Sequence, residues 1–213
     1  MWYPFAKRLL DLVGVALLLV LTTPLFAATA LAIVLDSSGP IFYRGLRVGR
    51  HGRRFHMLKF RTMVADAEQR GGTSTADDDR RITRVGAVLR AYKLDELPQL
   101  INVLRGEMSL VGPRPQVEHD VAMYTEEERA LLTVPPGVTD YASIQFRHEG
   151  EILRGHPDPD AAYVDLIRPE KIRLGLEYVR RRSLGVDVAI LASTVLALFG
   201  GRAAQRRPRE RSR

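Results

Sequence analysis

The sequence contains no cysteine, which excludes disulfide bonds and metal sites built on thiolates. It also contains no glycine-rich phosphate loop of the nucleotidase or kinase type. A catalytic serine elbow and a cluster of histidines are missing as well. Lysine is scarce, so the formal net charge of +7 comes mainly from arginine; the lysines are Lys7, Lys59, Lys93 and Lys171. Arginine binds phosphate in a planar, bidentate way, and a basic chain suits nucleic acid, an anionic membrane surface or phosphorylated small molecules.

What the 213-residue chain does contain is one long apolar run, over residues 12–35, with no charge inside it. At about 1.5 Å per residue, a straight helix of this length spans a bilayer of roughly 30 Å. A cleaved signal peptide is the least suitable interpretation, because the run continues past the cleavage-like residues 28–30. A transmembrane span and a helix that enters the membrane and returns on the same side remain.

The flanks and the middle of this run bear on its topology. Basic flanks favour the cytoplasmic side, and here both flanks are basic: Lys7 and Arg8 before the run, and Arg44, Arg47, Arg50, Arg53 and Arg54 after it. Pro24 lies near the middle, where proline removes a backbone donor and kinks a helix. The neighbouring threonine hydroxyls are expected to satisfy carbonyls freed by that kink. The residues alone leave a kinked span and a re-entrant helix open.

The rest of the chain predicts one domain of mixed α/β character that is mainly helical. Residues 41–43 and 55–60 read as strands around a turn at 49–52, which predicts a hairpin. Two amphipathic helices follow, and the second starts near Asp95 and runs to Leu104. Residues 109–115 must be extended or turned, since each residue before a proline is pushed out of the helical region.

Toward the C-terminus the pattern is again mostly helical. We expect a charged helix at 125–133, a turn at 134–137, and a strand-like or irregular segment at 138–146. A helix over 160–182 is expected to be interrupted near Pro169. Residues 183–199 fit either an interfacial helix or a core-packed terminal helix. The arginine-rich residues 201–213 predict a disordered tail.

Two adjacent carboxylates, Asp95 and Glu96, stand at the predicted start of the second helix. An aspartate there is first of all a good N-cap, and Glu96 suits the positive end of the helix dipole. However, Arg90, Lys93 and Arg114 are close in sequence, and a carboxylate among cations stays ionised. Such a group suits a nucleophile or a ligand of Mg²⁺, which commonly bridges a protein carboxylate and a substrate phosphate. The set predicts a phosphate-handling site beside a membrane.

Three stretches make this prediction specific: KFRTM at 59–63, LDELPQLINVLRGEMSLVGPRP at 94–115 and PPGVT at 135–139. With them, the chain resembles the monotopic phosphoglycosyl transferases of the bacterial sugar transferase family, which initiate glycan assembly on polyprenyl phosphate. The resemblance covers nearly the whole chain except the arginine tail, and it matches the small, minimal type. It implies a re-entrant membrane helix over residues 1–38, broken at Thr23–Pro24, a catalytic domain over 39–200, and a location on the cytoplasmic face of the bacterial inner membrane.

The resemblance also implies a reaction. Asp95 would attack the β-phosphate of a UDP-sugar, release UMP and hold the sugar phosphate covalently until polyprenyl phosphate takes it. Asp95 would also contact Mg²⁺, and Glu96 would support metal placement or proton handling. UDP-sugar, polyprenyl phosphate, membrane lipid and downstream glycosyltransferases are the implied partners, and nucleic acid is not. A Mg²⁺-dependent phosphodiesterase or nucleotidase and a non-catalytic basic membrane adaptor are the rival hypotheses.

The remaining candidates are substrate-binding residues. By resemblance, phosphate oxygens would be held by Lys59, Arg90 and Arg114, with a weaker claim for Arg61, and Gly112 and Pro113 would belong to the same rigid turn as Arg114. After the proline-glycine turn the chain has TDYASIQFRHE, where many family members have TGWAQV followed by Asn-Gly-Arg. This departure leaves the sugar open. Residues that shape the sugar or nucleotide pocket are expected there, namely Tyr141, Gln145, Phe146 and Arg147, although Tyr141 and Phe146 fit the core equally well.

Overall fold

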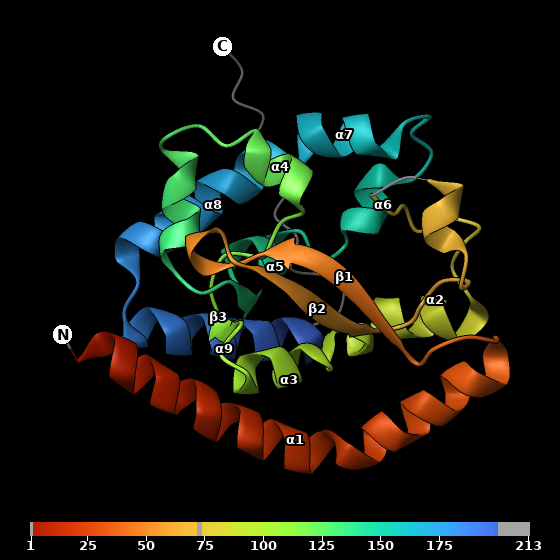
Figure 1. The fold of residues 1–213 in the computed structure, drawn as a ribbon, viewed down its shortest axis with the longest axis horizontal. Helices are drawn as coiled ribbons and strands as arrows, with labels where there is room; N and C mark the ends of the chain where they lie inside the picture. The colour runs from red at the N-terminus through yellow and green to blue at the C-terminus, as the bar shows by residue number, and fades with distance from the viewer. Residues whose placement is uncertain (1, 72–73, 200–213) are drawn as a thin grey trace.

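The computed structural model describes residues 2–71 and 74–199. Its first element is a helix of 34 residues, α1 (Tyr3–Asp36). It is long and apolar enough to cross a membrane, and only 11% of its most apolar window is buried inside the protein. A core helix of a soluble protein would be mostly buried, so the apolar surface of α1 suits lipid. The helix bends near its middle, and both ends turn toward the rest of the domain (Figure 1).

Pro24 lies inside α1, and its missing N–H removes the bond to the carbonyl of Val20. The threonine prediction needs a correction. The hydroxyls of Thr22 and Thr23 donate at 2.6 Å to the carbonyls of Leu18 and Leu19, which precede the freed one. Each bond runs from residue i to residue i−4, a geometry that bends helices. The bend therefore combines a missing backbone bond with two side-chain bonds.

A buried stripe with four-residue spacing joins α1 to the domain: Lys7, Asp11 and Val15. Asp11 accepts hydrogen bonds of 3.0 Å from the Ser109 hydroxyl and from the Leu110 amide. Because Ser109 and Leu110 belong to β3 (Ser109–Val111), this apolar helix is bonded directly to a central strand of the domain.

A second polar contact ties α1 to α9 (Leu184–Phe199), through fully buried Asp187. Its carboxylate lies 3.1 Å from Lys7 Nζ and accepts from the Tyr3 hydroxyl at 3.0 Å. The Tyr178 hydroxyl lies between this carboxylate (2.8 Å) and the carbonyl of Val111 (3.1 Å). On α9, Ile190 is buried while Val188, Val195 and Leu196 are exposed, so one face packs on the core and the other is open.

The predicted hairpin is confirmed. β1 (Phe42–Val48) pairs antiparallel with β2 (Arg54–Phe60) across η1 (Arg50–Gly52), with Tyr43 opposite Lys59. The strand β1 is longer than the sequence predicts. Beyond the hairpin, η2 (Ala67–Arg70) lies in the polar connecting segment that leads to α2 (Arg84–Ala91).

The predicted second helix is broken in two, as η3 (Leu94–Glu96) and α3 (Gln99–Leu104). The extended segment after it forms β3, which pairs in parallel with β4 (Gly137–Thr139). Here Gly112 and Gly137 meet: a Cβ atom on Gly137 would lie 2.1 Å from the Gly112 nitrogen. The two glycines therefore let the chain segments before and after residues 113–136 touch backbone to backbone.

The C-terminal half is helical, with one departure from the sequence pattern at 138–146, where β4 is followed by a helix. Its elements are α4 (Glu118–Ala122), η4 (Glu128–Thr133), α5 (Tyr141–Gln145), α6 (Glu149–Leu153), α7 (Pro159–Leu166), α8 (Arg168–Arg181) and α9. The break between α7 and α8 falls next to Pro169, as predicted. The main core joins α1, the hairpin, α3, β3, α8 and α9, through Val15, Met57, Val103, Val111, Tyr178 and Ile190. The predicted tail, 201–213, lies outside the described residues.

Candidate active site

The turn that carries the two carboxylates begins at Lys93, which adopts the left-handed conformation with φ of 58°. This residue ends the helical path of α2, and Pro98 then occupies the N-cap position of α3 with no side-chain cap. The prediction that Asp95 caps the helix is wrong. The chain breaks two residues before Asp95, so its carboxylate lies in a 3₁₀ turn and does not serve the start of α3.

Asp95 is buried, with 4% of its surface exposed. One carboxylate oxygen, Oδ2, lies 3.5 Å from Lys59 Nζ. The other, Oδ1, is buried and has no hydrogen-bond partner among the described residues. Buried polar atoms are almost always paired, and an unpaired carboxylate oxygen is costly. An unpaired anionic oxygen at this position is therefore a strong candidate for a reacting or ligand-binding atom.

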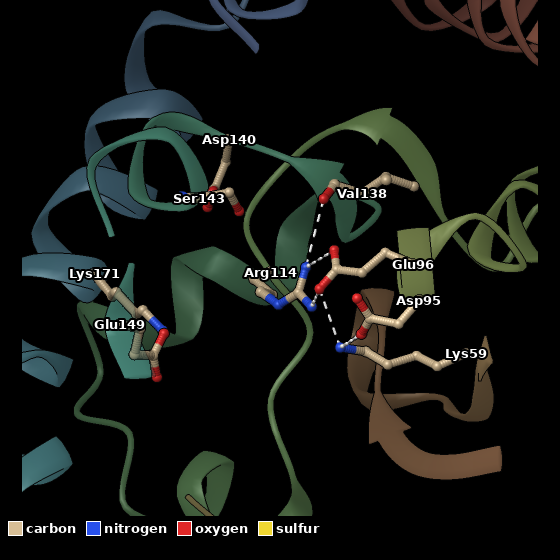
Figure 2. A network of polar contacts seen from close by, with 9 residues as sticks. All are labelled: Lys59, Asp95, Glu96, Arg114, Val138, Asp140, Ser143, Glu149 and Lys171. Carbon is tan, nitrogen blue, oxygen red and sulfur yellow. Dashed lines mark hydrogen bonds and ion pairs between the residues drawn. The ribbon is translucent and has the colours of Figure 1, made fainter. Parts of the chain in front are cut away.

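Glu96 has the opposite arrangement, because both of its oxygens are engaged (Figure 2). Lys59 Nζ donates to Oε1 at 3.0 Å, and Arg114 donates to Oε1 at 2.5 Å and to Oε2 at 3.0 Å. Burial alone would raise the pKa of Glu96, but Arg114, Lys59 and Lys93 together hold this pKa well below its usual range. Glu96 is thus a fixed anion that orients two cations, and it is poorly suited to carry a proton at neutral pH.

Arg114 approaches the dyad from the turn after β3. Its Nη1 atom also contacts the Val138 carbonyl at 3.5 Å. Burial opposes its charge, yet Glu96 raises the pKa of Arg114 above its usual range, so the guanidinium stays charged. The glycine contact between Gly112 and Gly137 fixes the backbone from which this side chain projects. Figure 2 shows Arg114 and Lys59 both directed at the carboxylate of Glu96, with Asp95 beside Lys59.

The wider set of predicted residues divides into those at the cavity and those elsewhere. An open cavity of about 2350 Å³ is lined by Lys59, Arg90, Asp95, Glu96, Pro113, Arg114, Phe146 and Arg147, among others. Arg147 is notable, because its Nε and Nη1 atoms are buried with no hydrogen-bond partner among the described residues. Donors left open in this way fit a bound anion or a sugar hydroxyl.

Three predicted residues make contacts away from the dyad. Arg61 also lines the cavity, but its guanidinium donates to the carbonyls of Ser37 and Ser38, so it secures the end of α1 instead of contacting the dyad. Tyr141 packs against the main core. Gln145 is exposed and contacts Glu170 on α8 at 3.4 Å. The structure does not bring Tyr141 or Gln145 to the cavity.

With this geometry in view, the comparison with known proteins is decisive. The sequence profile of the bacterial sugar transferase family matches residues 2–201. The chain belongs to the bacterial sugar transferase family.

Three relatives show how this chain compares with other members of the family. It is 40% identical over 196 residues to a UDP-glucose:undecaprenyl-phosphate glucose-1-phosphate transferase of Caulobacter vibrioides, covering 91% of this chain and 69% of the relative. It is 37% identical over 202 residues to a UDP-N-acetylgalactosamine-undecaprenyl-phosphate N-acetylgalactosaminephosphotransferase of Aeromonas hydrophila, covering 93% of this chain but only 45% of the relative. The exopolysaccharide production protein ExoY of Rhizobium meliloti is 35% identical over 208 residues, with 91% and 85% coverage.

Whether the site suits Mg²⁺ can be judged from its donors. Among residues 2–71 and 74–199, no group of three or more histidine, aspartate or glutamate side chains gathers as a ready cage. Mg²⁺ is usually held by one or two carboxylates with substrate phosphates and waters, so a cage is not required. The unpaired Oδ1 atom of Asp95 is a hard oxygen donor of the right kind. The residues therefore fit Mg²⁺ bound together with a phosphorylated substrate.

Lys93 matters more to the site than its sequence position indicates. The sequence places it only as a nearby cation, yet its charge interacts with Glu96 and Asp95. Burial lowers the pKa of Lys93, and Arg114 and Lys59 add to this effect. The sequence signal was its position two residues before Asp95, but the left-handed turn that directs it inward has no local signature.

Proposed function

We propose that this chain transfers a sugar-1-phosphate from a UDP-sugar to polyprenyl phosphate and releases UMP. The observation that carries the proposal is the unpaired, buried Oδ1 atom of Asp95 beside the Lys59–Glu96–Arg114 ion-pair cluster. Two of the relatives described above act, by their names, on a UDP-sugar and undecaprenyl phosphate. A reactive anion next to two phosphate-binding cations is the arrangement such a transfer needs.

In the first half of the reaction, Asp95 Oδ1 forms a bond to the β-phosphorus of the UDP-sugar. The bond between that phosphorus and the bridging oxygen breaks, and UMP leaves with the electron pair. The sugar phosphate stays on Asp95 as a mixed anhydride. In the second half, a phosphate oxygen of the polyprenyl phosphate attacks the same phosphorus, and Asp95 leaves as a carboxylate. The product is a polyprenyl diphosphate sugar, and the aspartate is regenerated.

The cations around the dyad have separate tasks in this scheme. Lys59 and Arg114 face the phosphoryl oxygens on which charge accumulates, and Glu96 holds both of them in place before substrate arrives. Arg90 and Arg147 line the same cavity and extend its positive surface. Bound Mg²⁺, held by Asp95 and substrate phosphates, would supply further neutralisation of phosphate charge.

The position of α1 explains why such a site belongs at a membrane surface. One substrate is soluble and charged, whereas the other is a long lipid with a phosphate head. We propose that α1 enters the cytoplasmic side of the inner membrane and returns at Thr23–Pro24, since its bend turns both ends toward the domain (Figure 1). Labelling of residues 2 and 37 from opposite sides of sealed vesicles would overturn this topology. Downstream glycosyltransferases would then extend the lipid-linked sugar, and no nucleic acid takes part.

The decisive experiment measures UMP release from a panel of UDP-sugars by the full chain, with polyprenyl phosphate and Mg²⁺. Asp95→Asn should abolish UMP release, and an intact-mass shift equal to one sugar phosphate should appear on wild-type protein when lipid is withheld. Glu118→Gln is the matched control, because Glu118 pairs with Arg54 on the exposed surface. Near-normal turnover of Asp95→Asn would show that Asp95 is not the nucleophile. Release of free sugar phosphate in the absence of lipid, at the full rate, would favour the phosphodiesterase hypothesis.

A further inference from the structure

Arg47 is a second cation on the same hairpin as Lys59, but it does not belong to the Lys59–Glu96–Arg114 ion-pair cluster. Side chains alternate along a strand, so Tyr43, Gly45 and Arg47 of β1 share one face. Tyr43 stands directly opposite Lys59, so this is also the face from which Lys59 reaches the carboxylates. Tyr43 and Arg47 both line the open cavity, as Lys59 does.

The middle residue of this face explains how Tyr43 and Arg47 come together. Gly45 is buried, and a Cβ atom there would lie 2.8 Å from the Tyr43 ring and 3.1 Å from Arg47 Nη1. Any larger residue would push the two side chains apart. With glycine present, the Tyr43 hydroxyl and the Arg47 guanidinium are hydrogen-bonded to each other. The pair is therefore a packed unit and not two independent surface side chains.

At contact distance, Arg47 meets uncharged groups in the part of the chain that the structure describes. Its polar contacts are the Tyr43 hydroxyl and the Leu46 carbonyl at 2.8 Å, both of which are uncharged. Among the ion pairs of the described residues, none includes Arg47, although the carboxylate of Asp120 faces it from a greater distance. Burial lowers the pKa of Arg47, and the nearby positive charge of Arg114 lowers it further. Arg47 and Arg114 line the same cavity and lie close enough for their charges to interact, so together they offer a binding place for an anion.

The location of Arg47 indicates which anion. The amide of Val48 donates to the carbonyl of Gln116 at 3.0 Å, so the end of β1 is bonded to the segment that follows Arg114. Arg47 is therefore held next to the segment that carries Arg114, whereas Asp95 lies 3.5 Å from Lys59. Moreover, β1 leads away from the end of α1 toward the far side of the domain (Figure 1). This direction suits the soluble substrate better than a lipid phosphate held at the membrane surface.

We propose that Arg47, together with the Tyr43 hydroxyl, forms a second phosphate subsite that binds the nucleotide-side phosphate of the UDP-sugar. This inference rests on the proposed function. Arg114 would then contact the diphosphate between its two phosphoryl groups, with Asp95 at the attacked one and Arg47 at the leaving one. Because the leaving phosphate gains charge as the bridging bond breaks, Arg47 would assist departure of UMP as well as binding.

The test uses the full chain in lipid nanodiscs and separates nucleotide phosphate from lipid phosphate. Arg47→Gln removes the charge, Arg47→Lys keeps it, and Arg53→Ala is the control. Arg53 is exposed, lies next to the turn of the same hairpin and does not line the cavity. Binding of UMP and of uridine is measured directly by calorimetry, and KM is measured separately for the UDP-sugar and for polyprenyl phosphate. Thermal unfolding of each variant checks that the fold is retained.

We expect Arg47→Gln to weaken UMP binding by about 10- to 100-fold, as for loss of a charged hydrogen bond, and to leave uridine binding unchanged. Arg47→Lys should recover part of this loss, and Arg53→Ala should behave as wild type. Equal effects on UMP and uridine, or a change in KM for polyprenyl phosphate alone, would overturn the subsite. A loss of stability without any ligand-specific effect would make Arg47 a structural partner of Asp120. If wild-type protein binds UMP but turns over no UDP-sugar, the proposed function fails while the subsite stands.

Discussion

The Arg114–Glu96 pair is the interaction in the site whose strength can be worked out most directly. Arg114 makes two bonds to one carboxylate, and the two side chains are 22% and 18% exposed. Removing one partner of a buried, bidentate pair typically costs about 3–5 kcal/mol, because it leaves the other charge buried. Glu96 keeps Lys59 as a partner and retains some solvent contact, so we expect Arg114→Ala to lower the free energy of unfolding by about 2–3 kcal/mol.

A double-mutant cycle distinguishes this pair from unrelated effects of truncation. Glu96→Ala and Arg114→Ala are each compared with the double variant by equilibrium unfolding in a mild detergent, and we expect a coupling energy of about 1–3 kcal/mol. The exposed Arg180–Glu127 pair, at 3.5 Å with 62% and 74% exposure, provides a matched cycle that should give nearly none. Losses at Arg114 and Glu96 that simply add, within about 0.5 kcal/mol, would refute the reasoning. In turnover assays, Arg114→Ala should also lower kcat by about 10²–10³.

Three further predictions test other parts of the structure. Lys93→Gly should be more stable than Lys93→Ala by about 1 kcal/mol in thermal unfolding, because glycine accepts the left-handed conformation. Burial lowers the pKa of Lys93, so wild-type stability should rise with pH from that lowered pKa toward the ordinary lysine value of 10.5, and this rise should be absent in Lys93→Gly. Asp187→Asn should lower the free energy of unfolding by about 3 kcal/mol, because it leaves Lys7 buried without its counter-ion. Adding Lys7→Met to this variant should restore much of the lost melting temperature. Arg147→Gln should raise the KM for the UDP-sugar about tenfold without lowering the melting temperature, since its buried donors have no protein partner to lose.

The parts of the fold that the sequence predicted are those that depend on local patterns. The apolar run, the hairpin around the glycine turn, the extended segment before Arg114 and the helix break near Pro169 all follow from spacing and from glycine or proline chemistry. The helix α5 was harder, because its five residues are too few to show a helical period and Asp140 caps it through a bond to the Ser143 amide. Short elements are set by such caps and by packing more than by propensity.

The site itself was predicted in its residue types and only partly in its geometry. Lys59 and Arg61 are two residues apart, and both are phosphate-binding candidates by sequence, Arg61 with the weaker claim. Because β2 ends at Phe60, Arg61 turns to the end of α1 while Lys59 reaches the dyad. Likewise, Tyr141 packs into the core. In each case the position of the side chain depends on which element, distant in sequence, it contacts. No local sequence pattern predicts that contact.

The false prediction about Asp95 points to why this residue is available for chemistry. An aspartate that caps a helix has an oxygen bonded to a backbone amide, and that oxygen is then a poor nucleophile. In this chain the left-handed Lys93 ends one helical path early, and Pro98 occupies the N-cap position of the next without needing a side-chain acceptor. Asp95 is thus held in a rigid turn between two helices while its Oδ1 atom accepts no bond from the described residues. Glu96, the next residue, pairs with Arg114 at 2.5 Å and with Lys59 at 3.0 Å, whereas Asp95 lies 3.5 Å from Lys59. Glu96 thus holds cations that would otherwise pair more closely with Asp95. In the proposed mechanism, the adjacent carboxylates therefore divide the work: Glu96 positions the cations that bind phosphate, and Asp95 keeps an oxygen free to react.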